Sequence, residues 1–540
     1  MRRFIFISII FLFALRVYSW QLVSSVSALQ TAINAASEGD TIYLQNGTYL
    51  NNTLTLSKNN LHIMAQSNGG VTLNGTNAIV ISGNNNVFSG FQFTSGSISG
   101  FVIEVTGSNN TLRQLNFNGY SAQKYINIKA PSQYNLVSYC NFENKPISAP
   151  AGNLIHVGAD AVIPGYHTIS HCSFQNMPGA GGDNGNECIR LSNGAQSTYV
   201  ARTVVEYCYF ENTGGGDSEC LSVKCMENTL RFNTFNNNPD AMMVFRNGNN
   251  NIAYGNFFLN SGGIRVKEAN NIYCYNNYFY QAGVGGTMNA VSYIYVNPNL
   301  NNINFSYNTF VECGMIDFAS GATNNTWANN LFYKNSGDLF MGQATGINFM
   351  GNLFNGTLGI GISSGMNPIL TNLVLNANGC YELAAGSTAI DASVSGFPAI
   401  IDIAGIDDDP SLLFDYSLQG RPALVSSKDI GCDEYTAGTK LNTPLALADV
   451  GPAYLGGPPT EQRLVELTSY RLLQNPFTQY IQLTNCKGNE NFTLYNSQSA
   501  VLWSGRNIQE QNFAYLTQGL YVLKIEGGKG VSSALKVIKK

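Results

Sequence analysis

Three cationic side chains fall at nearly the same place in three successive repeats of this chain. Lys224, Arg246 and Lys267 lie 11, 12 and 12 residues before the phenylalanines that close three consecutive short apolar runs. If these runs are adjacent strands, about 4.8 Å apart, the three cations lie close together. Like charges at that spacing repel one another, so carboxylates or an anionic ligand should compensate them. Spacing alone leaves open the alternative that each cation is an ordinary solvated surface residue.

Oxygen-bearing side chains adjoin these cations. In the run GGGDSECLSVKC, strand alternation directs Asp217 and Glu219 to one face. One repeat earlier, the run NGNECIRLS contains Asn184 and Asn186. Carboxylate and amide oxygens suit Ca²⁺, whereas zinc would call for histidine and cysteine. The four histidines show no metal-ligand spacing and no CxxC pair is present, so zinc is disfavoured. The alternative for Asp217 and Glu219 is a role as ion-pair partners of the nearby cations.

The elements that must position these residues follow from a repeat. Eleven times a phenylalanine closes a short β-prone run, at intervals of 21 to 36 residues. A period of about 20 to 30 residues indicates stacked units, because one turn cannot bury its apolar face alone. Asparagine-rich turns adjoin nearly every run, and asparagine tolerates the left-handed backbone of a corner. We therefore predict an all-β solenoid whose repeats end at Phe93, Phe117, Phe142, Phe174, Phe210, Phe235, Phe258, Phe279, Phe310, Phe332 and Phe354.

The longest repeats hold chain that a regular coil does not need. Gaps of 32 and 36 residues follow one another between residues 142 and 210, immediately before the coil richest in polar residues. Loops carry function more often than the strands they connect. We expect these loops to contribute to specificity.

The two ends of the chain differ from the repeats. A basic start and an apolar run over residues 1–19 predict a secretory signal, and no later segment has the roughly 20 apolar residues that a membrane span requires. Helical spacing within residues 24–37 predicts a short helix that caps the first coil. We expect coils over 20–440, a Pro- and Gly-rich closing segment and linker over 441–464, and a small β-sandwich over 465–540.

Cysteine and charge narrow the class further. Cys140, Cys172 and Cys208 each precede a repeat phenylalanine by two residues and should stack. Adjacent strands hold Cβ atoms slightly too far apart for a relaxed disulfide, so a buried thiol ladder is favoured over disulfides, and Cys188 and Cys220 face the same alternatives. A formal net charge of −5 excludes a generally basic surface of the kind that coats nucleic acid. An acidic ligand would need a local cationic cluster.

Several motifs in order resemble polysaccharide lyase family six, the right-handed parallel β-helix group that contains alginate lyases and chondroitinase B. They are NGNECIRLS, GGGDSECLSVKC, NTLRFNTF and MMVFRNGNNN, with KDIGCDEY and LALADVGPAY resembling that family's closing segments. The resemblance spans roughly residues 20–455. It implies that Lys224 is the catalytic base and Arg246 the catalytic arginine. It further implies that Asp217, Glu219 and Asn184, or alternatively Asn186, bind Ca²⁺.

The resemblance also implies a reaction and a substrate class. We expect a secreted, monomeric lyase that cleaves an anionic uronate polysaccharide, most often alginate in this group, by β-elimination. Arg190, Arg265 and Lys267 would hold neighbouring carboxylates or sulfates. Two departures stand out: the family's first acidic ligand is typically Glu rather than Asp217, and the residue after the lysine is typically Ser rather than Cys225. Because the lysine and the arginine are kept, we expect activity to persist.

Other functions remain as alternatives. The substrate could be dermatan sulfate, or the chain could be a β-helix adhesin or carbohydrate-binding protein without catalysis, because a fold does not dictate a function. A glycoside hydrolase would need paired catalytic carboxylates, and the one acidic run, at residues 407–409, is better interpreted as a loop. The C-terminal residues resemble a type IX secretion sorting domain, which implies export to the cell surface or medium. A carbohydrate-binding module is the competing interpretation for that domain.

Overall fold

The computed structural model describes most of the chain. The described residues are 19–177, 186–214, 219–286, 288–294, 300–318, 321–361, 373–375, 379–436, 440–458, 477–483, 490–496, 501–526 and 532–539. The predicted signal therefore lies outside them, apart from Ser19. No helix in these ranges combines the length and hydropathy that a membrane-spanning helix needs.

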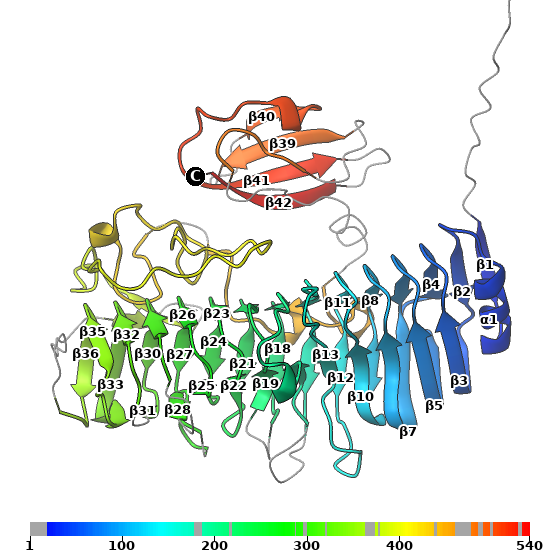
Figure 1. Ribbon diagram of the computed structural model, residues 1–540, viewed down its shortest axis with the longest axis horizontal. Coiled ribbons are helices and arrows are strands. Elements are labelled where there is room, and N and C mark those ends of the chain that lie inside the picture. The colour runs from blue at the N-terminus through cyan, green and yellow to red at the C-terminus, as the bar shows by residue number, and fades with distance from the viewer. Residues whose placement is uncertain are drawn as a thin grey trace, which may run out of the picture.

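Residues 20–357 form a parallel β-solenoid, as predicted (Figure 1). Its coils stack three ladders of parallel strands. The first ladder is a sheet of 14 strands: β1 (Trp20–Val23), β2 (Thr41–Leu44), β4 (His62–Ala65), β6 (Val87–Ser89), β8 (Thr111–Arg113), β11 (Leu136–Ser138), β14 (Thr168–Ser170), β17 (Val204–Glu206), β20 (Thr229–Arg231), β23 (Asn251–Tyr254), β26 (Ile272–Tyr275), β29 (Ile303–Ser306), β32 (Asn325–Ala328) and β35 (Ile347–Met350).

The other two ladders share long strands near the amino end and so form one sheet of 22 strands. The second ladder contains β3 (Gly47–Leu56), β5 (Val71–Ile81), β7 (Phe91–Val105), β10 (Ser121–Ile128), β13 (Ile155–Val157), β16 (Ile189–Leu191), β19 (Glu219–Val223), β22 (Met242–Arg246), β25 (Ile264–Lys267), β28 (Val291–Ile294), β31 (Ile316–Phe318) and β34 (Phe340–Gly342). The third contains β9 (Asn116–Asn118), β12 (Asn141–Glu143), β15 (Ser173–Gln175), β18 (Tyr209–Glu211), β21 (Thr234–Asn236), β24 (Phe257–Leu259), β27 (Tyr278–Tyr280), β30 (Thr309–Val311), β33 (Leu331–Asp338) and β36 (Leu353–Thr357).

The repeat phenylalanines form one continuous buried stack. From Phe93 to Phe354 each ring packs on the next at 4.4 to 5.3 Å between centroids, with nearly parallel planes. Strand register places them directly opposite one another, as for Phe235 and Phe258. Because the side-chain period of a strand is two, one residue of slippage would turn every ring to the outside, so this stack fixes the register.

Asparagine stabilises the corners in two ways. Asn85, Asn109, Asn237, Asn250 and Asn271 adopt positive φ angles, as their turns predict. A second set is buried and forms a ladder in which each residue hydrogen-bonds the next. In this ladder the backbone N–H and the side-chain Nδ2 of each asparagine both donate to Oδ1 of the next member. The members, in order, are Asn233, Asn256, Asn277, Asn308, Asn330 and Asn352.

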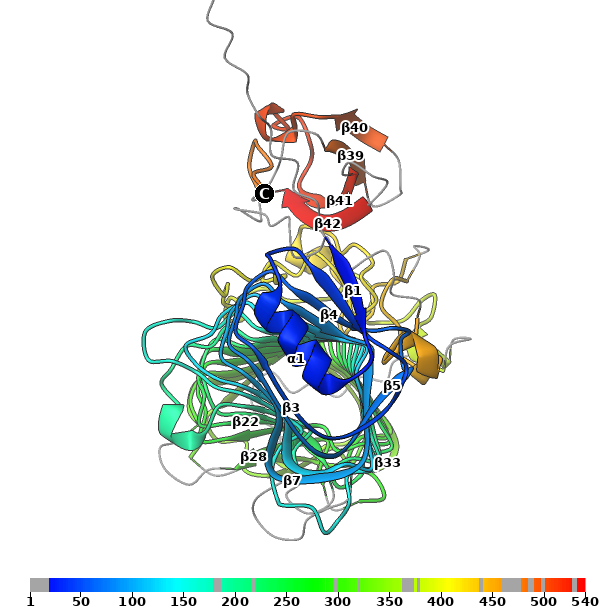
Figure 2. The ribbon, with the colours of Figure 1, turned by 90° about the vertical axis from the view of Figure 1, so that its right-hand side faces the viewer.

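The predicted helix caps the amino end of the solenoid. It is α1 (Val26–Ala35), and its N-cap Ser25 accepts a hydrogen bond from the backbone N–H of Ala28. Leu29 and Ile33 are buried against the first coil. Figure 2, a view along the solenoid, shows α1 lying across this end. The helix thus covers an apolar face that has no preceding coil to pack on.

The cysteines form a ladder of buried free thiols. Cys140, Cys172 and Cys208 are fully buried and directly precede three neighbouring strands of the third ladder, β12, β15 and β18. Cys188 and Cys220 are also buried and free. The ten cysteines of the described residues are all unbridged, which agrees with the favoured thiol interpretation.

The coils end earlier than expected. In the described residues the last parallel strand is β36, whereas regular coils were expected to continue to about residue 440. Residues 379–458 instead form an irregular closing segment. Its first strand, β38 (Tyr381–Leu383), pairs antiparallel with the preceding β37 (Leu373–Leu375), and runs of 3-10 helix follow at Val425–Ser427, Leu447–Asp449 and Ala453–Leu455. Figure 1 shows this segment folded back along the outside of the solenoid.

The carboxyl-terminal strands form a separate small sheet. It is antiparallel, in the order β40 (Val501–Gly505), β39 (Asn491–Asn496), β41 (Gly519–Glu526), β42 (Ser532–Lys539). It has its own apolar core, which includes Phe477, Leu494, Phe513 and Leu523. A second facing sheet, which a β-sandwich would require, is not seen in the described part of residues 465–540.

Candidate functional site

The strand register of the second ladder aligns the three cations. Arg246 lies opposite Lys267 in the β22–β25 pair. Val223 lies opposite Phe245 in the β19–β22 pair, so Lys224, the next residue, adjoins Arg246. Because Val223 and Phe245 point into the core, the alternating side chains of the three cations lie on the outer face. The spacing in the sequence therefore predicts this alignment correctly.

Lys224 is unusually buried for a lysine on an outer face. The residue is 5% exposed, and its Nζ lies 4.0 Å from Oε1 of Glu187. Burial, and after it the Arg190 guanidinium, lower the pKa of Lys224, and Arg246 has a smaller effect in the same direction. The carboxylates of Glu219 and Glu187 oppose this shift. The amine is therefore closer to its neutral form than an exposed lysine would be.

Glu187 is a site residue that the predicted set does not include. Its carboxylate is almost fully buried, accepts a 2.7 Å hydrogen bond from Nδ2 of Asn153, and lies 3.8 Å from Nη1 of Arg190. The available signal in the sequence is its place in NGNECIRLS, immediately before the core residues Cys188 and Ile189 and one coil before Lys224. A buried carboxylate at that position needs a nearby cation.

Glu219, an expected metal ligand, also contacts the expected catalytic arginine. Its Oε1 pairs with Nη1 of Arg246 at 3.0 Å, so the ion-pair alternative is realised for this residue. Its Oε2 is buried and has no hydrogen-bond partner within the described part of the chain. A buried carboxylate oxygen without a hydrogen-bond partner is a suitable ligand for a hard cation such as Ca²⁺.

The remaining expected metal ligands are only partly described. Asn184 and Asp217 lie outside the described residues. Asn186, the alternative to Asn184, is 5% exposed and has a positive φ of 68°, and its backbone N–H donates to the carbonyl of Gly152. In the ranges that the structure describes, no group of three His, Cys, Asp or Glu residues is placed to hold a metal.

The cations expected to hold substrate lie beside Lys224 on the same outer face. Arg190 lies opposite Ser222 in the β16–β19 pair, and its side chain is 25% exposed. Arg265 and Lys267 lie two residues apart and therefore on the same face of β25. Nη2 of Arg265 contacts Sδ of Met288 at 3.1 Å. Lys267 is half-buried. The structure thus brings Lys224, Arg190, Arg246, Arg265 and Lys267 onto one stretch of the second ladder.

A histidine extends this stretch toward the amino end. His156 lies opposite Arg190 in register, and Asn127 lies opposite His156 on the coil before. Burial, followed by the nearby Lys124 and Arg190 charges, lowers the pKa of His156 to about 3. The imidazole is therefore neutral at any ordinary working pH.

The sequence matches a known protein family over much of its length. The sequence profile of the chondroitinase B family matches residues 23–314, which is more than half of the 540 residues. No curated protein matches the sequence.

Solved structures share the fold at low identity. The polysaccharide lyase family 6 alginate lyase AlyGC superposes with a TM-score of 0.60 at 22% identity over 68% of this chain and 55% of that one. This chain therefore spans only about half of that protein. A mannuronic acid specific family 6 lyase from human gut microbiota gives 0.53 at 21% identity, covering 63% and 86% of the two chains. A family 6 alginate lyase solved with a trisaccharide gives 0.55 at 16%, covering 69% and 92%. By its sequence match, and in agreement with its fold, this chain belongs to the chondroitinase B family of polysaccharide lyases.

Proposed function

We propose that the protein is a secreted lyase that cleaves alginate by calcium-assisted β-elimination and leaves unsaturated uronate ends. The observation that carries this proposal is the environment of Lys224. Its buried amine adjoins Arg190 and Arg246 and two buried carboxylates, Glu187 and Glu219. An amine kept close to neutrality beside guanidinium groups is the combination that proton abstraction next to a carboxylate requires.

The reaction makes separate demands on these residues. Lys224, as the neutral amine, takes the proton from C5 of a uronate, which is weakly acidic because its carbanion pushes charge onto a carboxylate. Arg246 can bind that carboxylate through two parallel hydrogen bonds and stabilise the developing charge. Its high pKa makes it a poor proton donor, so the departing O4 receives its proton from water. Calcium, when bound by Glu219 and its neighbours, would supply further positive charge beside the substrate carboxylate.

Two uronate polymers are candidates for the substrate. The structural relatives named above are alginate lyases or act on mannuronic acid, whereas the matching family is named for an enzyme of chondroitin B, that is dermatan sulfate. Both polymers present a uronate carboxylate to the aligned cations. Alginate is the proposed substrate, and dermatan sulfate is the alternative.

One assay separates these functions. Purified protein is incubated with alginate or with dermatan sulfate, with and without a calcium chelator, and the ultraviolet absorbance of unsaturated ends is followed. The proposal expects product from alginate, loss of product on chelation and recovery on adding Ca²⁺. Product from dermatan sulfate alone would identify dermatan sulfate, and not alginate, as the substrate. Binding of either polymer without any product would identify a non-catalytic carbohydrate-binding protein, and activity that survives thorough chelation would refute the calcium role.

Export is proposed separately. The predicted signal over residues 1–19 and the likeness of the carboxyl-terminal residues to a type IX sorting domain support release to the cell surface or the medium. Deleting residues 465–540 should then leave the protein inside the cell envelope with its lyase activity unchanged. Normal release of the truncated protein would favour the carbohydrate-binding interpretation of this domain.

A further inference from the structure

Glu187 occupies a position between the two cations that flank the proposed reaction centre. Its Oε1 lies 4.0 Å from Nζ of Lys224 and 3.8 Å from Nη1 of Arg190. Its Oε2 is fixed from the other side by the 2.7 Å hydrogen bond from Asn153, which is itself 2% exposed. The carboxylate is therefore held in place within a chain of contacts that crosses three successive coils, from Asn153 through Glu187 to Lys224.

We propose that Glu187 is a positioning residue for Lys224, which holds the amine toward the substrate and stabilises the ammonium that proton abstraction creates. This inference rests on the proposed lyase function. In the step concerned, the C5–H bond breaks and its proton joins Nζ of Lys224. The electron pair forms the C4–C5 double bond, and the C4–O4 bond breaks as O4 leaves with its electrons and takes a proton from water.

The charges around Lys224 show why a carboxylate is needed there. Burial and two arginines, Arg190 and Arg246, favour the neutral amine. That favours the starting state of the base but disfavours the ammonium product of proton transfer, so an uncompensated amine would be a weak base. Glu219 and Glu187 both favour the ammonium. Glu219 is paired with Arg246 at 3.0 Å, whereas Oε1 of Glu187 lies 4.0 Å from Nζ of Lys224.

Glutamine and aspartate variants test this role. Glu187→Gln keeps the size and an oxygen that can accept from Asn153, but removes the charge. We expect kcat on the polymer to fall about 10- to 100-fold with KM within about threefold of the parent, by analogy with groups that orient a functional side chain. Glu187→Asp keeps the charge and should recover part of kcat. Asn153→Ala frees the carboxylate and should give an intermediate loss. Glu211→Gln is the matched control, because Glu211 lies on β18 of the third ladder, where it accepts from Asn236, and not among the cations of the second ladder.

Several outcomes would overturn the inference. Unchanged kcat in a folded Glu187→Gln variant would do so, as would equal losses in the Gln and Asp variants. If the apparent calcium affinity of Glu187→Gln falls and saturating Ca²⁺ restores kcat, Glu187 is a metal ligand instead. Thermal midpoints are recorded for every variant. If Glu187→Gln does not fold, the kcat values of Glu187→Asp and Asn153→Ala test the positioning role, and parental kcat in both variants would refute it. Failure of the parent to act on any uronate polymer refutes the proposed function itself, whereas an active parent with an unaffected variant refutes only the role of Glu187.

Discussion

At the scale of single residues, the burial of Lys224 makes its loss diagnostic. Lys224→Ala should lower kcat/KM by about 10²- to 10⁴-fold, the range that a positioned general base contributes. Lys334→Ala is the control, because Lys334 donates to the backbone carbonyl of Asp338 on β33, away from the second ladder's cations. Initial rates of double-bond formation measure both. A Lys224→Ala protein as active as its parent would refute the assignment of the base.

The direction of the Lys224 pKa shift predicts a pH dependence. Because the base must be neutral, kcat/KM should rise with pH through the pKa of Lys224 and level off below the ordinary lysine value of 10.5. Arg190 lowers this pKa, so Arg190→Gln should raise it and move the rising limb to higher pH. A pH profile of kcat/KM for parent and variant measures the displacement. A limb that stays in place, or moves to lower pH, would contradict the electrostatic role of Arg190.

At the scale of elements, the buried asparagine ladder makes a specific contribution to stability. Oδ1 of Asn256 accepts from the backbone and the amide of Asn233, and its Nδ2 donates to the carbonyl of Leu230. Asn256→Ala leaves these buried groups unsatisfied and should destabilise the solenoid by at least about 1–3 kcal/mol.

The exposed corners provide the comparison for that variant. Asn237 has a positive φ and lies at an exposed turn, where glycine is readily accommodated. Asn237→Gly should therefore leave the thermal midpoint nearly unchanged, while Asn256→Ala lowers it clearly. Equal midpoints for the two variants would show that the ladder adds little to stability.

These elements also show how far sequence alone reaches. The phenylalanine spacing predicts the stack and hence the register, and the register aligns Lys224 with Arg246 and Lys267. The burial of Glu187 cannot be predicted in the same way, because it depends on Asn153 one coil earlier, across a gap of irregular length. The ladder of Asn233 and Asn256 is equally hidden, since a buried asparagine and an exposed turn asparagine look alike in a sequence.

At the scale of the whole molecule, the closing segment ties distant coils together. From residue 432 onward it contacts progressively earlier coils: the backbone N–H of Cys432 donates to Thr309, Asn442 donates to the carbonyl of Gly255, and the backbone N–H of Gly451 donates to the carbonyl of His171. The expected end of the coils near residue 440 is wrong for this reason. Residues after β36 do not add coils but pack against the outside of existing ones, and their irregular pattern carries no repeat.

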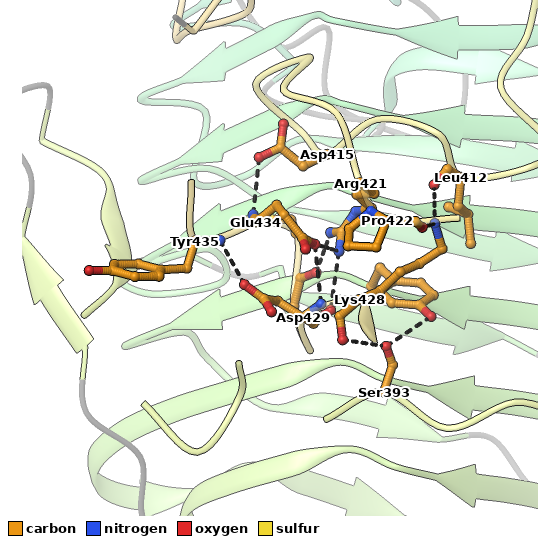
Figure 3. A network of polar contacts seen from close by, with 12 residues as sticks. Ser393, Leu412, Asp415, Arg421, Pro422, Lys428, Asp429, Glu434 and Tyr435 are labelled. Atoms are coloured by element: carbon orange, nitrogen blue, oxygen red, sulfur yellow. Dashed lines mark hydrogen bonds and ion pairs between the residues drawn. The ribbon is translucent and has the colours of Figure 1, made fainter. Parts of the chain in front are cut away.

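The acidic residues of this segment form ion pairs and hydrogen bonds with the coils and within the segment. Asp407 and Asp408 pair with Arg231, and Asp408 also accepts from Thr229, which agrees with the loop interpretation of this run. Farther along, Arg421 pairs with Glu434 at 2.9 Å and donates to the carbonyl of Gly431 (Figure 3). Buried carboxylates outnumber the cations that meet them here, so several are held at a cost in free energy when ionised.

Asp433 allows that cost to be measured. Burial, and after it the charge of Asp415, raises the pKa of Asp433 to about 7, and its Oδ2 accepts from the backbone N–H of Leu383. A group whose folded pKa exceeds its unfolded value stabilises the fold at acid pH and loses that contribution as pH rises, here between about pH 4 and 7. Asp433→Asn keeps the acceptor and cannot ionise.

The thermal midpoint of Asp433→Asn should therefore stay near that of the parent at pH 5 and exceed it at pH 8. Asp338→Asn, at an exposed end of β33, is the matched control and should follow the parent at both pH values. Midpoints measured by circular dichroism across this range test the sign directly. A parent that gains stability relative to Asp433→Asn on going from pH 5 to pH 8 would show that the Asp433 carboxylate is stabilised as an ion. The closing segment would then hold its charges through ion pairing rather than against desolvation.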